Sequence, residues 1–173
     1  MKHIVSLSGG IGSYITLKKI LEVEAKENVI AVFCDTLFED GDLYRFLEDI
    51  KSELDIEIVT LCVGKTPFEL CFERKFLFNS RVAPCSKILK SIPFANYLKT
   101  LNEDFIIYMG IDWSEVHRCE KIKLHYKPHE VKFPLTEKPY ITKQEMLHEL
   151  EKVKIATPRL YQLGFSHNNC GGR

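Results

Sequence analysis

Short apolar runs and amphipathic stretches alternate along this chain, and the alternation predicts its secondary structure. Apolar runs bounded by polar or turn residues are typical of buried strands. They cover Ile4–Leu7, Val29–Cys34, Ile56–Leu61, Phe105–Met109 and, more weakly, Val131–Leu135. Apolar residues at helical spacing predict helices from residue 14 to about 26 and over Asp42–Leu54. A further helix begins at Thr142 and runs to about Lys152, because Glu145 completes a capping box.

Strands that alternate with helices predict a parallel sheet, since parallel neighbours need a crossover connection, which is right-handed. The expected fold is therefore α/β. It is a three-layer, Rossmann-like arrangement in which a mainly parallel sheet of about five strands carries helices on both faces. Pro84 and Pro93 are expected to limit a helical patch at Ser86–Lys90 to a short piece before a second helix at Phe94–Leu101.

Composition and charge narrow the class of protein. The 173 residues are 45% hydrophobic, enough for a sizeable core, and no apolar stretch is long enough to cross a membrane. Twenty-four basic residues balance 24 acidic ones, so net charge indicates neither nucleic acid nor a membrane as partner. No linker interrupts the chain, so 1–173 is expected to be one domain, with 155–173 as a cysteine-bearing C-terminal segment. The start lacks a signal-peptide pattern, so a cytoplasmic location with reduced cysteines is expected.

The run Ser6-Leu7-Ser8-Gly9-Gly10-Ile11-Gly12-Ser13 lies where the first strand ends and the first helix begins. Two adjacent glycines let the backbone turn tightly and leave its N–H groups unobstructed, and serines add donors at the positive end of the helix dipole. These features are typical of a phosphate site. The alternative is a glycine-rich turn without a ligand. The spacing matches neither the P-loop of kinases and GTPases nor the dinucleotide motif G-x-G-x-x-G.

Two further segments follow predicted strands, Asp35-Thr36 after the second and Gly110-Ile111-Asp112 after the fourth. Because the carboxyl ends of parallel strands meet at one edge of a sheet, both are expected beside the glycine run. Asp35 could accept from an adenine amino group or a ribose hydroxyl, and Asp112 could orient a nucleophile or hold a metal. The alternative for each is a solvated turn aspartate.

The pattern Ser-Gly-Gly-x-x-Ser at 8–13 resembles the PP-loop of the adenine nucleotide alpha-hydrolase superfamily, which includes ATP pyrophosphatases and phosphoadenosine phosphosulfate (PAPS) reductases. Other segments resemble PAPS reductase-like proteins in the correct order. They are Asp35-Thr36-Leu37-Phe38-Glu39, Tyr44-Arg45-Phe46-Leu47, Ala83–Lys90, Gly110-Ile111-Asp112 with Glu115 and Arg118, Phe133-Pro134-Leu135, Pro158–Phe165 and His167-Asn168-Asn169-Cys170. The chain is identified as a PAPS reductase-like member of this superfamily.

The resemblance implies a set of site residues. Those that bind the nucleotide are Ser6, Ser8, Gly9, Gly10, Ile11, Gly12, Ser13, Asp35, Thr36, Lys87, Lys90 and Gly110, and the catalytic ones are Asp112, Arg118, Cys85 and Cys170. Relatives attack the alpha-phosphorus of ATP and release pyrophosphate, or they bind a sulfonucleotide. Either reaction needs N–H donors and cations around phosphate. The cations available are Arg81, Lys87, Lys90 and Arg118, with ordinary surface charge as the alternative.

The chain departs from the family pattern in three places. Many ATP pyrophosphatases have an aspartate that helps to engage magnesium and pyrophosphate, where this chain has Gly12. It lacks the Glu-Cys-Gly-x-His motif of PAPS reductases. Of the Cys-Cys and Cys-x-x-Cys pairs of iron–sulfur sulfonucleotide reductases, it retains Cys85 and Cys170. Pro84 and Arg173 take the companion positions, so a four-thiolate cluster is not expected.

Several roles stay open for Cys85 and Cys170. They could form a redox dithiol, carry sulfur as a persulfide, form a metal site completed by His167 or a partner, or be remnants of a lost cluster. A chain that continues past Arg173 could supply the second cysteine. The cysteines expected to be buried small hydrophobes are Cys34, Cys62 and Cys71, and Cys119 has no assignment.

The expected function is that of a PP-loop enzyme that binds ATP or a related adenine nucleotide. It would act at the alpha-phosphate, where it would adenylylate an unknown acceptor or hydrolyse the nucleotide, and it would release pyrophosphate. One alternative is a PAPS or APS (adenosine phosphosulfate) reductase, or a sulfur-transfer enzyme, that uses Cys85 and Cys170. The other is a noncatalytic nucleotide sensor, because Gly12 replaces the aspartate. Magnesium is left open as a cofactor, no resident metal site is expected, and a homo-oligomer is compatible with the sequence.

Overall fold

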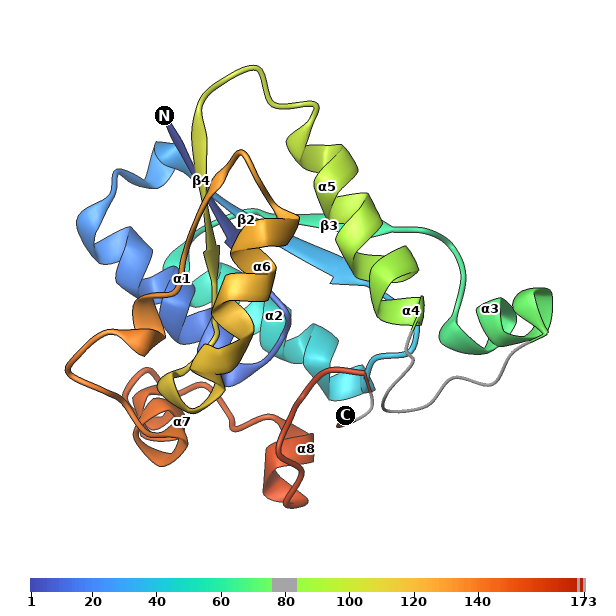
Figure 1. Cartoon of the computed structure of the whole chain (residues 1–173). Helices are drawn as coiled ribbons and strands as arrows, with labels where there is room; N and C mark the ends of the chain where they lie inside the picture. Colours follow the sequence, from blue (N-terminus) through green and yellow to red (C-terminus); the bar gives the residue numbers. More distant parts are fainter. Residues whose placement is uncertain (76–83, 171, 173) are drawn as a thin grey trace.

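Figure 1 shows the computed structural model, which describes residues 1–75, 84–170 and 172. Five parallel strands form a sheet in the order β3-β2-β1-β4-β5. Their bounds are β1 Lys2–Ser6, β2 Val29–Asp35, β3 Ile58–Cys62, β4 Phe105–Met109 and β5 Glu130–Lys132. The chain thus places β2 and β3 on one side of β1 and then β4 and β5 on the other. In this register, Ile4 of β1 lies between Ile30 of β2 and Ile107 of β4.

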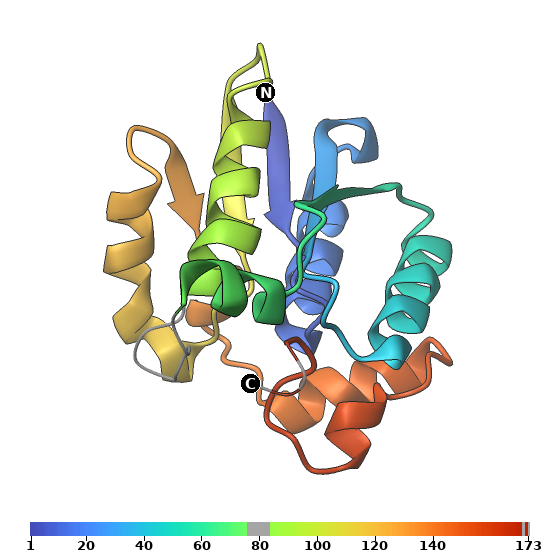
Figure 2. The ribbon, with the colours of Figure 1, turned by 90° about the vertical axis from the view of Figure 1, so that its right-hand side faces the viewer.

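Helices cover both faces of the sheet, which confirms the three-layer α/β prediction (Figure 2). The α-helices are α1 Ile11–Val23, α2 Gly41–Leu54, α3 Pro67–Arg74, α4 Pro84–Ser86, α5 Ile92–Leu98, α6 Cys119–His125, α7 Lys143–Lys152 and α8 Arg159–Gln162. The other helical turns are the 3-10 turns η1 Lys26–Asn28, η3 Trp113–Arg118 and η4 Pro134–Thr136 and the π-turn η2 Lys87–Ser91.

Two hydrophobic clusters hold the layers together, one on each face of the sheet. Adjacent strand residues point to opposite faces, so Val5 joins the cluster of α1, α2 and α7, whereas Ile4 joins that of α5 and α6. Both side chains are fully buried. Burial on both faces is typical of a parallel sheet, and it explains why β1 is an uninterrupted apolar run.

The predicted capping box of α7 is confirmed. The N–H of Glu145 donates to the hydroxyl of Thr142 at 3.2 Å, and the N–H of Thr142 donates to the Glu145 carboxylate at 2.7 Å. A second capping box, formed by Thr66 and Glu69, begins α3, and this helix was not predicted from the sequence. The first helix also begins earlier than predicted, at Ile11, because it starts inside the glycine run, where glycine and serine give no apolar periodicity.

The prediction that Pro84 and Pro93 separate two helical pieces is wrong. Helical backbone continues from Pro84 to Leu98 through α4, η2 and α5 (Figure 1). Pro93 has no N–H to donate to the preceding turn. That turn widens into a π-turn, in which the N–H of Ile92 donates to the carbonyl of Lys87. The wider turn therefore accommodates the proline without ending the helix.

The fifth strand is shorter than predicted and ends at Lys132. Pro134 cannot donate to a strand ladder, and it begins the turn η4 instead. Leu135, expected in the strand, lies in η4 and is still buried, with 1% of its surface exposed. Within the described ranges, no helix has the length and apolar character needed to span a bilayer.

Candidate functional site

A cavity of about 680 Å³ lies at the carboxyl ends of β1 and β4. In a sheet of this order, the crevice between β1 and β4 is where α/β folds collect ligands. The glycine run lines one part of the cavity, and η3, the start of α7 and residues of the C-terminal segment (155–170) line the rest. Three segments were predicted to meet at this edge of the sheet. Two of them do meet here, the glycine run and Gly110–Asp112.

The glycine run forms a compact loop between β1 and α1. Gly9 has a φ of +79°, which suits glycine, and a Cβ at this position would lie 2.6 Å from Leu43 Cδ1. Ser13 Oγ accepts from the N–H of Ser8 at 3.1 Å and donates to the carbonyl of Gly10 at 2.8 Å. Gly9 is buried and does not line the cavity. The predicted residues of this region that line the cavity are Ser6, Ser8, Gly10, Ile11, Gly12 and Ser13.

Asp112 and Arg118 line the cavity on the side of η3, together with Gly110. Asp112 Oδ1 accepts from the N–H of Ser114 at 2.8 Å and from its hydroxyl at 2.6 Å, so this carboxylate caps η3. Arg118 pairs with Glu115, and 48% of its side chain is exposed. Both predicted residues are therefore at the cavity, although each also has a local structural partner.

Some cavity residues were not assigned to the site from the sequence. Trp113, the single tryptophan, stacks on Tyr140 with ring centroids 5.6 Å apart. Lys143 Nζ lies 4.4 Å from the ring centre of Tyr161. The Tyr161 hydroxyl accepts from the N–H of Ile11 at 3.0 Å. These contacts join segments that are distant along the chain, so no local spacing signals them.

The third segment predicted at this edge, Asp35-Thr36, lies outside the cavity. Asp35 Oδ1 accepts from the hydroxyl of Tyr44 and from the N–H of Leu37, each at 2.8 Å. Thr36 is buried and donates to the Glu39 carboxylate at 2.8 Å. Neither Asp35 nor Thr36 lines the cavity. Their role as nucleotide ligands therefore remains a prediction.

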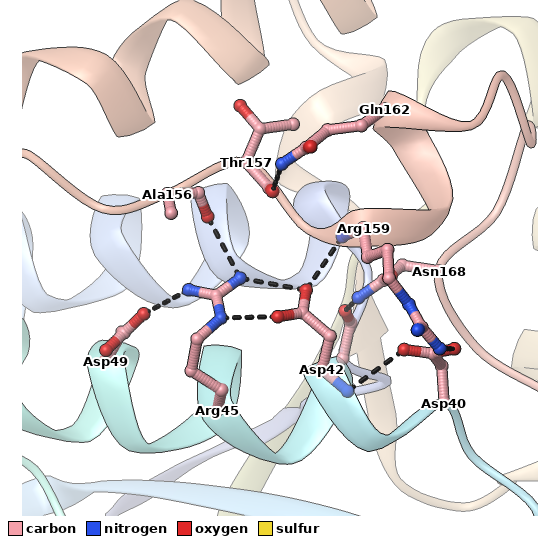
Figure 3. A network of polar contacts seen from close by, with 10 residues as sticks. Asp40, Asp42, Arg45, Asp49, Ala156, Thr157, Arg159, Gln162 and Asn168 are labelled. Atoms are coloured by element: carbon pink, nitrogen blue, oxygen red, sulfur yellow. Dashed lines mark hydrogen bonds and ion pairs between the residues drawn. The ribbon is translucent and has the colours of Figure 1, made fainter.

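A network of ion pairs fastens the C-terminal segment to α2 (Figure 3). Asp42 accepts from the backbone N–H of Arg159 at 2.7 Å and from Arg45 Nε at 2.6 Å. Arg45 Nη2 donates to the carbonyl of Ala156 at 3.1 Å, and Arg159 pairs with Asp40. The Arg159 side chain lowers the pKa of Asp40, and the Arg45 side chain lowers the pKa of Asp42.

Cys170, at the end of the C-terminal segment, lies in a charged cluster with Lys90 and Glu39. Lys90 Nζ donates to Cys170 Sγ at 2.8 Å and lies 3.6 Å from the Glu39 carboxylate, which is fully buried. The backbone N–H of Cys170 donates to Glu39. Burial raises the pKa of the Cys170 thiol, Lys90 opposes this shift and Glu39 adds to it. Lys90 is therefore engaged by Cys170 and Glu39 rather than by the cavity.

The other predicted residues near this cluster differ in their placement. Cys85 is half-buried and near enough to Cys170 to contribute to the raised pKa of that thiol. Lys87 is exposed and does not line the cavity, whereas His167 is exposed and lines it. Arg81 lies outside the described residues.

The prediction of buried cysteines is wrong for Cys62, which is exposed. It ends β3, which is an edge strand of the sheet that the described residues form. Cys34 and Cys71 are half-buried, and Cys119 is buried. Among residues 1–75, 84–170 and 172, no three His, Cys, Asp or Glu side chains are grouped so that they could hold a metal ion.

Comparison with known proteins gives a family match over nearly the whole chain. Residues 2–166 match the family model described as phosphoadenosine phosphosulfate reductase domain. The crystal structure of phosphoadenylyl-sulfate (PAPS) reductase from Candida auris, a phosphate complex, has a similar fold, with a TM-score of 0.67 and 14% sequence identity. The similarity covers 96% of this chain and 79% of that one. No curated protein is similar enough to this chain to count as a relative.

Proposed function

The chain belongs to the phosphoadenosine phosphosulfate reductase domain family, and on this premise we propose that it binds an adenine nucleotide with its phosphates on the loop Ser8–Ser13. The observation that carries the proposal is that this loop, at the start of α1, lines a cavity of about 680 Å³. Backbone N–H groups at a helix start favour an anion, and the volume suits a nucleotide. Arg118 and Lys143 add positive charge to the cavity wall.

A sulfonucleotide, PAPS or APS, is the ligand that family membership supports better than ATP. In the proposed reaction, the Cys170 thiolate attacks the sulfur, the S–O bond to the phosphate breaks, and the nucleotide leaves with the electron pair. The Cys85 thiolate then attacks the Cys170 sulfur, releases sulfite and leaves a disulfide. Two thiols thereby supply two electrons, and an external dithiol restores them.

The role proposed for Cys170 rests on its surroundings, because the family match ends at residue 166. Burial and Glu39 raise the pKa of the Cys170 thiol, and the Lys90 ammonium, 2.8 Å from the sulfur, opposes this shift and favours the thiolate. Asn168 and Asn169, just before Cys170, line the cavity. The attacking sulfur is thus attached to a segment that already reaches the nucleotide site.

The second candidate is the ATP reaction, in which an unidentified acceptor attacks the alpha-phosphorus and pyrophosphate leaves. One observation favours it: neither Cys85 nor Cys170 lines the cavity, and phosphoryl chemistry at the loop needs no thiol. In this reaction the loop N–H groups and Arg118 would stabilise the negative charge that develops on the phosphate.

The test is to incubate the full chain with PAPS, APS or ATP in the presence of dithiothreitol and to measure sulfite, pyrophosphate and nucleotide products. Binding is followed by calorimetry and by the fluorescence of Trp113, which lines the cavity and is the single tryptophan. The variants are Cys170→Ser and Cys85→Ser. The control is Cys62→Ser, which removes an exposed thiol outside the cavity.

Sulfite release that is lost in Cys170→Ser and kept in Cys62→Ser supports the reductase reaction. AMP and pyrophosphate without sulfite support the second candidate. Binding without any product indicates a noncatalytic sensor. If neither calorimetry nor fluorescence detects any of the three nucleotides, the proposed nucleotide site is wrong.

A further inference from the structure

Helix α1 begins without a side-chain cap of its own. Its N-cap is Gly10, and its first N–H, that of Ile11, donates at 3.0 Å to the hydroxyl of Tyr161, 150 residues away along the chain. A Cβ on Gly10 would lie 3.3 Å from this hydroxyl, so glycine leaves the space that the phenol occupies. An oxygen from the C-terminal segment therefore lies where the loop is expected to hold phosphate.

The Tyr161 hydroxyl still has a proton to donate. It uses a lone pair to accept from Ile11, and across the described part of the chain no group accepts its O–H. Burial raises the pKa of Tyr161 above its ordinary value, a shift that the Ile11 hydrogen bond opposes only in part. The phenol therefore stays protonated at neutral pH, and because Tyr161 lines the cavity, a ligand there can accept its proton.

Lys143 contacts the Tyr161 ring, and Asn168 separately joins the same segment to the loop. Lys143 Nζ lies 4.4 Å from the ring centre and also donates to the carbonyl of Ser166. On the other side, Asn168 Nδ2 donates to the carbonyl of Gly9 at 2.8 Å. The C-terminal segment is thus joined to the loop at Gly9 and at Ile11, and a positive charge lies beside the phenol.

We propose that Tyr161 is a nucleotide-contacting residue: its hydroxyl takes the N–H of Ile11 and donates its own proton to a phosphate oxygen of the nucleotide in the cavity. Lys143 supplies charge beside this contact. The inference rests on the nucleotide site proposed above, and it adds that the C-terminal segment supplies part of the phosphate site. The phenol takes up the N–H of Ile11 and offers its own O–H in its place, so the site keeps a donor at this point without the cost of burying a further charge.

The test is the affinity of the full chain for AMP and for adenosine, measured by calorimetry in wild type and in Tyr161→Phe. This variant keeps the ring under Lys143 and removes only the hydroxyl. AMP is expected to bind about tenfold more weakly, the loss for one hydrogen bond to a charged group, and adenosine, which has no phosphate, within about twofold of wild type. The control is Tyr14→Phe, which removes the hydroxyl of a tyrosine in α1. This hydroxyl donates to the Glu53 carboxylate at 3.2 Å, and Tyr14 does not line the cavity.

A selective loss of AMP affinity in Tyr161→Phe, absent in Tyr14→Phe, supports the proposal. Unchanged AMP affinity overturns it while leaving the nucleotide site intact. Tighter AMP binding in Tyr161→Phe also overturns it, because this result would show that the hydroxyl competes with the phosphate for the N–H of Ile11. An equal loss for AMP and adenosine assigns Tyr161 a purely structural role. If the wild type binds no nucleotide, the proposed function fails first and this inference with it.

Discussion

Gly12 and Gly110 meet backbone to backbone. A Cβ on Gly110 would lie 2.6 Å from the carbonyl carbon of Gly12 and from the nitrogen of Ser13, and a Cβ on Gly12 would lie 3.0 Å from the carbonyl oxygen of Gly110. The start of α1 therefore rests directly on the end of β4. This contact provides a physical reason for glycine at position 12, where many ATP pyrophosphatases have aspartate, since a side chain there presses on the backbone of β4.

Gly110→Ala is expected to destabilise the protein by about 1–3 kcal/mol, the usual cost of over-packing, because the methyl group meets backbone atoms that cannot turn away. Gly41→Ala is the matched control, since a Cβ at Gly41 meets no atom within 4 Å and alanine is the better helix former. Thermal denaturation compares the two. Equal melting temperatures for both variants would show that the contact between α1 and β4 is looser than described.

Asp42→Asn is expected to loosen the C-terminal segment, because the carboxylate that joins Arg45 to the N–H of Arg159 becomes a weaker acceptor. Hydrogen exchange of residues 156–170 should accelerate. Asp49→Asn is the control, since Asp49 pairs with Arg45 and makes no bond to the segment among the described residues. Equal exchange in both variants would contradict the prediction.

The same contact sets a pH dependence for the C-terminal segment. The Arg45 hydrogen bond lowers the pKa of Asp42 below its ordinary 3.8, against the effect of burial. A carboxyl with a lowered folded-state pKa contributes stability above its unfolded pKa and loses it as pH falls through the folded value. The protection factors of 156–170 in the wild type, which compare exchange with its intrinsic rate at each pH, should therefore stay high from neutral pH downward and fall only in strongly acidic solution. A fall in protection between pH 7 and 5 would point to a different group.

Asn168→Asp is expected to lower the melting temperature at pH 7. Asn168 is 1% exposed, and its Nδ2 donates to the carbonyl of Gly9 at 2.8 Å. An ionised aspartate has the same shape but sets an oxygen against this carbonyl and buries a charge. The loss should shrink as pH is lowered, because a protonated carboxyl can donate again. The control is Asn169→Asp, at a half-buried neighbour. A decrease in the melting temperature of Asn168→Asp that does not change with pH would contradict the mechanism.

Alkylation of Cys170 by iodoacetamide is expected to be slow at pH 7 and to rise with pH, because burial raises the pKa of this thiol. Lys90→Met removes the charge that lowers the pKa, so the rise should move to higher pH. Glu39→Gln removes a charge that raises the pKa, so the rise should move to lower pH. Residue-specific mass spectrometry measures each rate. Shifts in the same direction for both variants would show that accessibility, and not charge, controls Cys170.

Local patterns predicted the elements whose signal lies within a few residues. β4 was predicted residue for residue as Phe105–Met109, because a strand buried on both faces is an apolar run with polar ends. The start of α7 was predicted because its cap and its partner, Thr142 and Glu145, are three residues apart. The continuation of the helix through Pro93 was not predicted, because a π-turn that accommodates a proline has no distinct residue pattern.

The order of strands and helices, the parallel sheet and the glycine run at the end of the first strand could be predicted from local patterns, since each depends on periodicity or on a short motif. Which residues share the site could not be predicted in this way, because it depends on the folded arrangement. This arrangement places Tyr161 on Ile11, Asn168 on Gly9 and Lys90 on Cys170, and it leaves Asp35 outside the cavity. These contacts join residues far apart along the chain, and their formation depends on how the helices pack and where the C-terminal segment docks, which no local spacing encodes.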